Sequence, residues 1–210
     1  MTKEPSQESD LNAYIKFLKE RIFFEPQSPI FHYNLGLAYA RKRLIDDAIS
    51  EFKQAIECDP NLAEAYVNLG GLIFQKGDLE GAIQANLKAL SLNPNLPMGH
   101  SNLACAYLQK GEFQETIASS LRALELNPRL IHAYNNLAVG YLHLEQPEPS
   151  IEASRKILEL QPQFAPAHFT LAVGYRMMGK TDLARDSLQR AKELGYPVDD
   201  ETEAQFRDEG

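Results

Sequence analysis

Apolar residues recur along the chain at helical spacing in paired short segments, and the pairs repeat every 34 residues. In the segment AEAYVNLGGLIFQKGDLEGAIQANLKALSLNPNL, two helix faces are marked, first by Tyr66, Leu69 and Ile73 and then by Ala82, Ile83, Leu87 and Leu90. Between them, Gly77 can adopt a positive φ and Asp78 can cap the second helix. Each period therefore predicts a helical hairpin with about 13 residues in each helix.

Prolines fix the register of these periods, because a helix tends to end before the residue that precedes proline. They fall 34 residues apart, at Pro26, Pro60, Pro94, Pro128 and Pro162. With Pro29 as position 1, five full repeats are predicted at 29–62, 63–96, 97–130, 131–164 and 165–198. We expect residues 1–10 to be disordered, 11–28 to form a capping helix that equals half a repeat, and 199–210 to be an acidic tail.

Small and large residues alternate at fixed positions of the period. Position 8 is always Gly or Ala, and position 7 is always leucine. Small residues opposite large ones allow antiparallel helices to interdigitate without voids. This pattern resembles the tetratricopeptide repeat (TPR). The other positions that carry the resemblance are tyrosine at position 11, glycine at 15, alanine at 20 and 27, and proline at 32. The resemblance implies an all-α fold, a right-handed α-solenoid of stacked helix-turn-helix repeats whose first helices line a concave groove.

An asparagine occupies position 6 in four of the repeats, at Asn34, Asn68, Asn102 and Asn136. It lies one residue before the buried leucine, which turns it by about 100° from the seam between the helices toward the groove. A side-chain amide can pair with both the N–H and the C=O of a peptide backbone. The row resembles the asparagine ladder in the repeat arm of O-GlcNAc transferases. The alternative is that asparagine is merely a helix-compatible residue that is common at this position in the family.

Other positions predicted to face the groove are apolar, and an exposed apolar stripe generally marks an interaction surface. The candidates for peptide binding are Tyr33, Phe74, Leu108, Leu142, Phe169 and Met177. Part of this stripe could instead be covered by the neighbouring helix. If the stripe is open, the ligand is a peptide with apolar anchors, extended or helical, that the asparagines orient.

Charge and composition exclude several classes of function. The chain has 210 residues and a formal net charge of −8, much of it in the C-terminal segment, so it offers no basic footprint for nucleic acid. No segment has the 18 or so uninterrupted apolar residues that a membrane span needs. The two cysteines, Cys58 and Cys105, suit a reducing compartment, and we expect a cytoplasmic protein.

The sequence shows no constellation typical of catalysis, so we expect no enzyme activity, no cofactor and no metal. His32, His100 and His168 share position 4 but lie two repeats apart, which favours packing over ligation of one ion. Cys105 has no partner base that would activate it as a nucleophile. The glycines recur at fixed positions of the repeat and do not form the glycine-rich motif of a phosphate-binding loop. A clamp for a terminal carboxylate, known in one TPR subfamily, would need basic residues at positions 2 and 5, and these are absent.

Two functional hypotheses remain. The first is a non-catalytic scaffold or adaptor that binds a protein or peptide in the concave groove. The second is a self-assembling structural protein that forms homo-oligomers through its repeat ends, because Phe23 and Phe24 at one end and a thin cap after Leu194 at the other leave both ends open.

Overall fold

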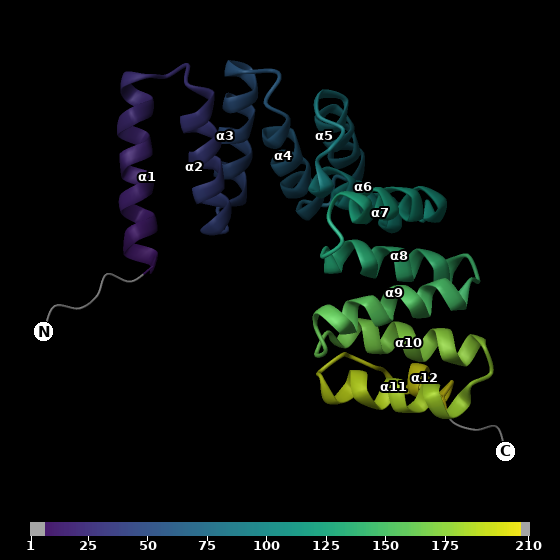
Figure 1. The fold of residues 1–210 in the computed structure, drawn as a ribbon. Coiled ribbons are helices and arrows are strands. Elements are labelled where there is room, and N and C mark those ends of the chain that lie inside the picture. The colour runs from purple at the N-terminus through teal and green to yellow at the C-terminus, as the bar shows by residue number, and fades with distance from the viewer. Residues whose placement is uncertain (1–6, 207–210) are drawn as a thin grey trace, which may run out of the picture. The chain divides into compact units, whose positions relative to one another are not determined.

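The computed structural model describes residues 7–206, which form helices joined by short turns and contain no strand (Figure 1). The helices are α1 (Gln7–Phe24), α2 (Pro29–Arg41), α3 (Ile45–Cys58), α4 (Ala63–Gln75), α5 (Leu79–Leu92), α6 (Pro97–Lys110), α7 (Phe113–Leu126), α8 (Ile131–His143), α9 (Pro147–Leu160), α10 (Ala165–Met177), α11 (Thr181–Glu193) and α12 (Asp200–Ala204). The predicted all-α class is confirmed. Helix α1 begins before the predicted Leu11, and residues 1–6 of the segment expected to be disordered lie outside the described residues.

The chain divides into two compact units, with the division between Asn102 and Leu103 inside α6. In the N-terminal unit each helix packs on the next, from α1 on α2 to α4 on α5. In the C-terminal unit the same order runs from α7 on α8 to α10 on α11. Each unit is therefore a series of antiparallel hairpins whose core lies along the seams between consecutive helices.

The turn inside each hairpin requires a residue in the left-handed region. Position 15 has a φ of 84° at Gly77, 78° at Gly111 and 68° at Gly179, and the same conformation occurs without glycine at Arg43 (58°) and Glu145 (57°). At each turn a backbone N–H of the following residue reaches back to the helix, as from Leu44 to the carbonyl of Tyr39. The predicted cap is also present, because Asp78 accepts a hydrogen bond of 2.8 Å from the N–H of Gly81.

The close approach of the two helices in a hairpin is set by positions 8 and 24. A Cβ on Gly36 would lie 2.8 Å from the ring of Phe52, and a Cβ on Gly70 would lie 2.3 Å from Nδ2 of Asn86. In the later repeats position 8 is a buried alanine, and position 24 is Ser120, Ser154 or Leu188. In the first four repeats a larger residue at one position thus faces a smaller one at the other, whereas in the fifth repeat Ala172 faces Leu188.

The position-4 histidines tie each first helix to the loop before it. Nε2 of His32, His100 and His168 bonds the carbonyl of the proline six residues earlier, at 3.0, 3.0 and 3.1 Å. His32 makes a second contact, because its Nδ1 lies 2.7 Å from a carboxylate oxygen of Glu51. These contacts give the histidines a structural role. Among residues 7–206, no group of three or more His, Cys, Asp or Glu could hold a metal ion.

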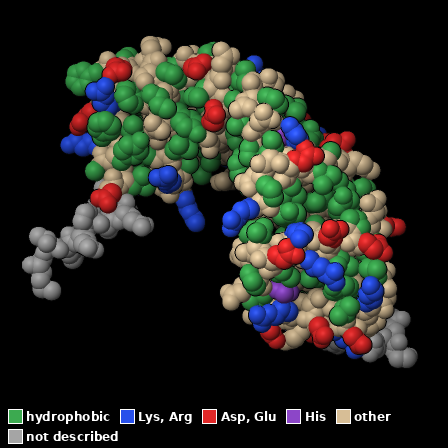
Figure 2. Space-filling model, viewed as in Figure 1, with side chains coloured by type: hydrophobic (Ala, Val, Ile, Leu, Met, Phe, Trp, Pro, Cys, Tyr) green, Lys and Arg blue, Asp and Glu red, His purple; other side chains and the backbone are tan. Residues whose placement is uncertain are grey.

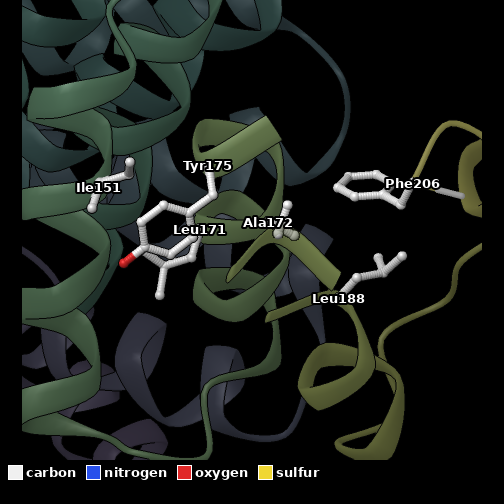
Figure 3. Packing of buried hydrophobic residues seen from close by; sticks show 7 residues of the cluster. Ile151, Leu171, Ala172, Tyr175, Leu188 and Phe206 are labelled. Carbon is white, nitrogen blue, oxygen red and sulfur yellow. The ribbon is translucent and has the colours of Figure 1, made fainter. Parts of the chain in front are cut away.

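The C-terminal end of α11 is covered by the residues that follow it, so it is not left open as the expected thin cap after Leu194 implied, while Asp199, Asp200 and Glu201 of the predicted acidic tail are exposed. Asp199 caps the short helix α12, and Phe206 is 5% exposed and packs with Leu188 of α11 (Figure 3). Arg185 donates a hydrogen bond of 3.1 Å to the carbonyl of Phe206, and Lys192 pairs with Glu203 at 2.8 Å. The last residues, 207–210, lie outside the described part of the chain. None of the described helices is long and apolar enough to cross a membrane.

Candidate functional site

A pocket of about 410 Å³ lies on the N-terminal unit among α2, α4 and the segment that begins α6. Its walls are largely apolar and include Tyr33, Val67, Leu72, Leu96 and Met98. The centroid of the Tyr33 ring lies 5.7 Å from that of the Phe52 ring, and Phe52 is fully buried beneath the pocket. Two of the predicted asparagines, Asn68 and Asn102, line the same pocket.

The amides of Asn68 and Asn102 have a fixed orientation, because both of their N–H groups are used inside the protein. Nδ2 of Asn68 donates to the hydroxyl of Tyr33 at 3.1 Å and to the carbonyl of Glu64 at 2.8 Å. Nδ2 of Asn102 donates to the carbonyl of Val67 at 3.2 Å and to Oδ1 of Asn86 at 3.3 Å.

The hypothesis that each amide offers both a donor and an acceptor to a ligand is therefore wrong for Asn68 and Asn102. A carboxamide nitrogen carries two hydrogens, and both are directed at protein oxygens. The Oδ1 of each side chain accepts no hydrogen bond from any described residue, so it is the amide atom that remains available to a ligand. The pocket thus offers two oriented acceptors, which suit N–H donors.

The electrostatic character of this pocket is anionic. Of the described residues that line it, Glu64 alone carries a charge, and no described residue forms an ion pair with its carboxylate. Burial raises the pKa of the Tyr33 hydroxyl, the hydrogen bond from Asn68 lowers it, and the nearby Glu64 raises it further. Tyr33 is therefore a neutral phenol at physiological pH, and the pocket favours apolar groups beside cationic ones.

A second pocket, of about 390 Å³, lies on the C-terminal unit along α8 and α10. Three predicted residues, Leu142, Phe169 and Met177, line it. The structure adds Tyr196, whose ring stacks on Phe169 with centroids 4.5 Å apart and planes 19° apart. A residue from the segment after α11 therefore already covers one of the aromatic rings that the sequence assigned to ligand binding.

Asn136, the fourth predicted asparagine, is buried, with 4% of its surface exposed. Its Nδ2 has no hydrogen-bond partner among the described residues, and its Oδ1 lies 3.9 Å from Sγ of Cys105. Neighbouring side chains enclose Asn136 in this structure, so its contact with a ligand stays a prediction that would require these side chains to move. Burial raises the pKa of the Cys105 thiol, and the hydrogen bond to Asn136 lowers it, so a reactive thiolate is disfavoured.

The remaining predicted residues, Asn34, Phe74 and Leu108, are partly exposed and line neither of these two pockets. Met98 and Asn86, which complete the N-terminal pocket and orient Asn102, were not predicted from the sequence. Position 2 has no fixed residue type across the repeats, so only the exposed location of Met98 distinguishes it. Asn86 could have been found as the one amide at position 24, which otherwise holds Phe, Ser or Leu.

Comparison with protein families gives matches described as TPR repeat, over residues 72–111, and as tetratricopeptide repeat, over residues 11–63, 51–84, 100–130 and 131–164. These matches together run from the first helix to the end of α9. A comparison with curated proteins finds no match.

Several solved structures share the fold. The crystal structure of MamA protein is 26% identical, with a TM-score of 0.69, and the alignment covers 79% of this chain and 91% of that one. YrrB, described as a TPR protein with an unusual peptide-binding site, is 18% identical with a TM-score of 0.72, over 85% and 92% of the two chains. The crystal structure of the APC/C hetero-tetramer Cut9-Hcn1 is 18% identical with a TM-score of 0.73, and the alignment covers 88% of this chain and 37% of that one. At 18% identity the last two show the fold alone.

Proposed function

Because this chain belongs to the tetratricopeptide repeat family, we propose that it is a non-catalytic scaffold or adaptor that binds an extended peptide of a protein partner in the pocket of the N-terminal unit. The observation that carries the proposal is the pair of oriented acceptors, Oδ1 of Asn68 and of Asn102, in an apolar pocket. YrrB, a protein of the same fold, has a peptide-binding site, which gives the proposal a precedent.

An extended peptide fits these acceptors better than a helix does. The N–H groups of a helical peptide are already bonded within the helix, whereas an extended backbone presents free N–H groups at intervals that neighbouring helices of an array can reach. Apolar side chains would contact Tyr33 and Met98, and a neighbouring Lys or Arg would be attracted to Glu64. Each backbone hydrogen bond would contribute about 0.5–1.5 kcal/mol, so we expect an affinity of about micromolar.

Selection of binders from a displayed library of random peptides, followed by fluorescence anisotropy with the recovered peptides, tests this proposal. Loss of both acceptors in Asn68→Ala/Asn102→Ala should weaken binding by roughly tenfold to a hundredfold, because two backbone hydrogen bonds are lost. Glu64→Gln should select against peptides that carry Lys or Arg.

Asn136→Ala is the matched control, since Asn136 has the same repeat position but is buried. It should leave peptide affinity unchanged. Equal affinity of the double variant and the parent protein for the selected peptides would rule out the acceptor role, provided that circular dichroism shows both to be folded.

The proposal also places the protein in the cytoplasm. Cys58 and Cys105 are both free thiols, which suits a reducing compartment. The alternative function, homo-oligomerisation through both repeat ends, is disfavoured at the C-terminal end because α12 and Phe206 cover α11. A peptide scaffold is therefore the function that the site supports best.

A further inference from the structure

The outer face of α1 exposes aromatic side chains that the N-terminal unit does not cover. Leu11, Ile15, Leu18 and Ile22 form the opposite face, and these residues pack toward α2. On the outer face Phe23 is 81% exposed, Phe24 is 74% exposed and Phe17 is 51% exposed. Figure 2 shows hydrophobic side chains gathered with charged ones over this end of the unit.

Exposed rings of this size mark an interaction surface, because contact with water is costly for each of them. At the other end of the chain, the apolar surface of α11 is covered by the chain itself, because Phe206 packs on it. No described residue does so for the outer face of α1, and Lys16, Lys19 and Glu20 surround a shallow hollow beside Phe23 and Phe24.

We propose that the outer face of α1 binds the same face of a second copy of this chain, as an antiparallel helix pair related by a two-fold axis. The outer face carries charges of both signs, so the face of one copy can be complementary to the same face of another copy. Lys16 and Glu20 lie four residues apart, form an ion pair of 3.9 Å within α1, and are both largely exposed, at 80% and 60%, so each can also reach a charge on a second copy. In an antiparallel pair whose axis passes at the level of Leu18, Lys16 of one copy lies opposite Glu20 of the second copy, and the converse pair forms as well.

The same register places large side chains opposite small ones. Phe23 comes opposite Ala13 of the second copy, and Ala13 is exposed and has no bulk to displace. Lys19 takes no part in this pairing, because its Nζ already lies over the Tyr39 ring of its own chain, 5.7 Å from the centroid. One register therefore satisfies the charge pairs and the contact of Phe23 together, which is the reason to favour a second copy over an unrelated partner.

The area available fits a weak and reversible dimer. Fully buried aromatic side chains remove about 150–250 Å² each, so the exposed parts of these rings could bury about 400 Å² per chain. Together with the flanking lysine and glutamate stems, the total is on the order of 1,000 Å², near the lower limit for a specific interface. Because an isologous contact uses the same face on both copies, association should stop at the dimer.

Sedimentation velocity over a concentration series tests the proposal on the full chain. We expect a monomer–dimer equilibrium with no larger species. Phe23→Ser/Phe24→Ser should raise the dissociation constant about tenfold or more without changing helicity, because both rings are exposed in the monomer. A monomer that persists at millimolar concentration, or a polymer that keeps growing with concentration, would overturn the proposal.

A charge exchange distinguishes this pairing from other modes of association. Lys16→Glu alone should dissociate the dimer, because it places two carboxylates opposite each other, and Glu20→Lys alone should do the same. The double variant Lys16→Glu/Glu20→Lys should restore dimerisation. Lys88→Glu on the exposed surface of α5 is the charge-matched control and should have no effect. Failure of the double variant to recover the dimer would contradict the antiparallel register. These outcomes are independent of peptide binding in the N-terminal pocket.

Discussion

An asparagine at position 6 of the repeat has two different environments in the two units. In the N-terminal unit, Asn102 lines an open pocket, and both of its N–H groups have acceptors at 3.2 and 3.3 Å. In the C-terminal unit, Asn136 is 4% exposed, and its Nδ2 has no hydrogen-bond partner among the described residues. The same residue at the same position thus orients an acceptor in one unit and is enclosed in the other.

The difference follows from position 24 of the preceding repeat. For Asn102 that residue is Asn86, whose Oδ1 accepts one of its hydrogens. For Asn136 the equivalent residue is Ser120, whose short side chain is itself buried without a partner among the described residues. In the first two repeats glycine at position 8 leaves room for Phe52 and Asn86 at position 24, and in the next two alanine faces a serine, whereas in the fifth Ala172 faces Leu188. In the second repeat, Gly70 therefore leaves room for Asn86, and Asn86 in turn orients the amide of Asn102.

The largest expected effect comes from removing that room in the N-terminal unit. Gly70→Ala would place a Cβ 2.3 Å from Nδ2 of Asn86, which is fully buried and cannot move aside. We expect a loss of about 1–3 kcal/mol in the free energy of unfolding, typical of overpacked cores. Urea denaturation followed by circular dichroism measures it.

A second substitution should reverse most of this loss. Gly70→Ala/Asn86→Ser reproduces the alanine and serine that the C-terminal unit has at Ala104 and Ser120, so the clash disappears. The same double variant should weaken peptide binding, because Asn102 then loses the acceptor that orients it. If Gly70→Ala alone is as stable as the parent protein, positions 8 and 24 are not sterically coupled.

A smaller effect, of opposite sign in the two units, is expected when each asparagine becomes leucine. Asn136→Leu should raise the free energy of unfolding by about 1 kcal/mol, because it removes a buried N–H without an acceptor among the described residues and keeps a similar volume. Asn102→Leu should lower it by about 1–3 kcal/mol, because Oδ1 of Asn86 loses a donor inside the core. Thermal melting of both variants gives the comparison, and equal losses would argue against different environments.

The sequence predicted the hairpins well because their signals are local and repeat in phase. Positions 7, 8, 15 and 32 recur at one interval, and each has a steric reason that holds within one hairpin. The environment of Asn136 could not be predicted in this way, because it depends on a neighbour in another repeat. Phe206 and Tyr196 were also missed as packing residues. Both lie at or beyond a one-residue insertion that ends the period, so no repeated pattern marks their contacts.

The smallest expected effect concerns the two turns that lack glycine, one in each unit. Arg43 has a φ of 58° and Glu145 a φ of 57°, a conformation that costs an L-residue with a side chain about 1 kcal/mol relative to glycine. Arg43→Gly and Glu145→Gly should therefore each raise the free energy of unfolding by about 0.5–1 kcal/mol, since glycine's greater freedom in the unfolded chain offsets part of the gain.

The reverse change, Gly77→Ala at the equivalent turn, should lower the free energy of unfolding by about 1 kcal/mol, although a Cβ there would meet no other described atom within 4 Å. The urea midpoints of the three variants separate backbone strain from packing, because none of these positions is buried. If only one of the two glycine substitutions stabilises the protein, the turns of the two units are not equivalent. If both raise the free energy of unfolding equally, the difference between the units lies at positions 8 and 24, where the helices of a hairpin meet, and not in the turns.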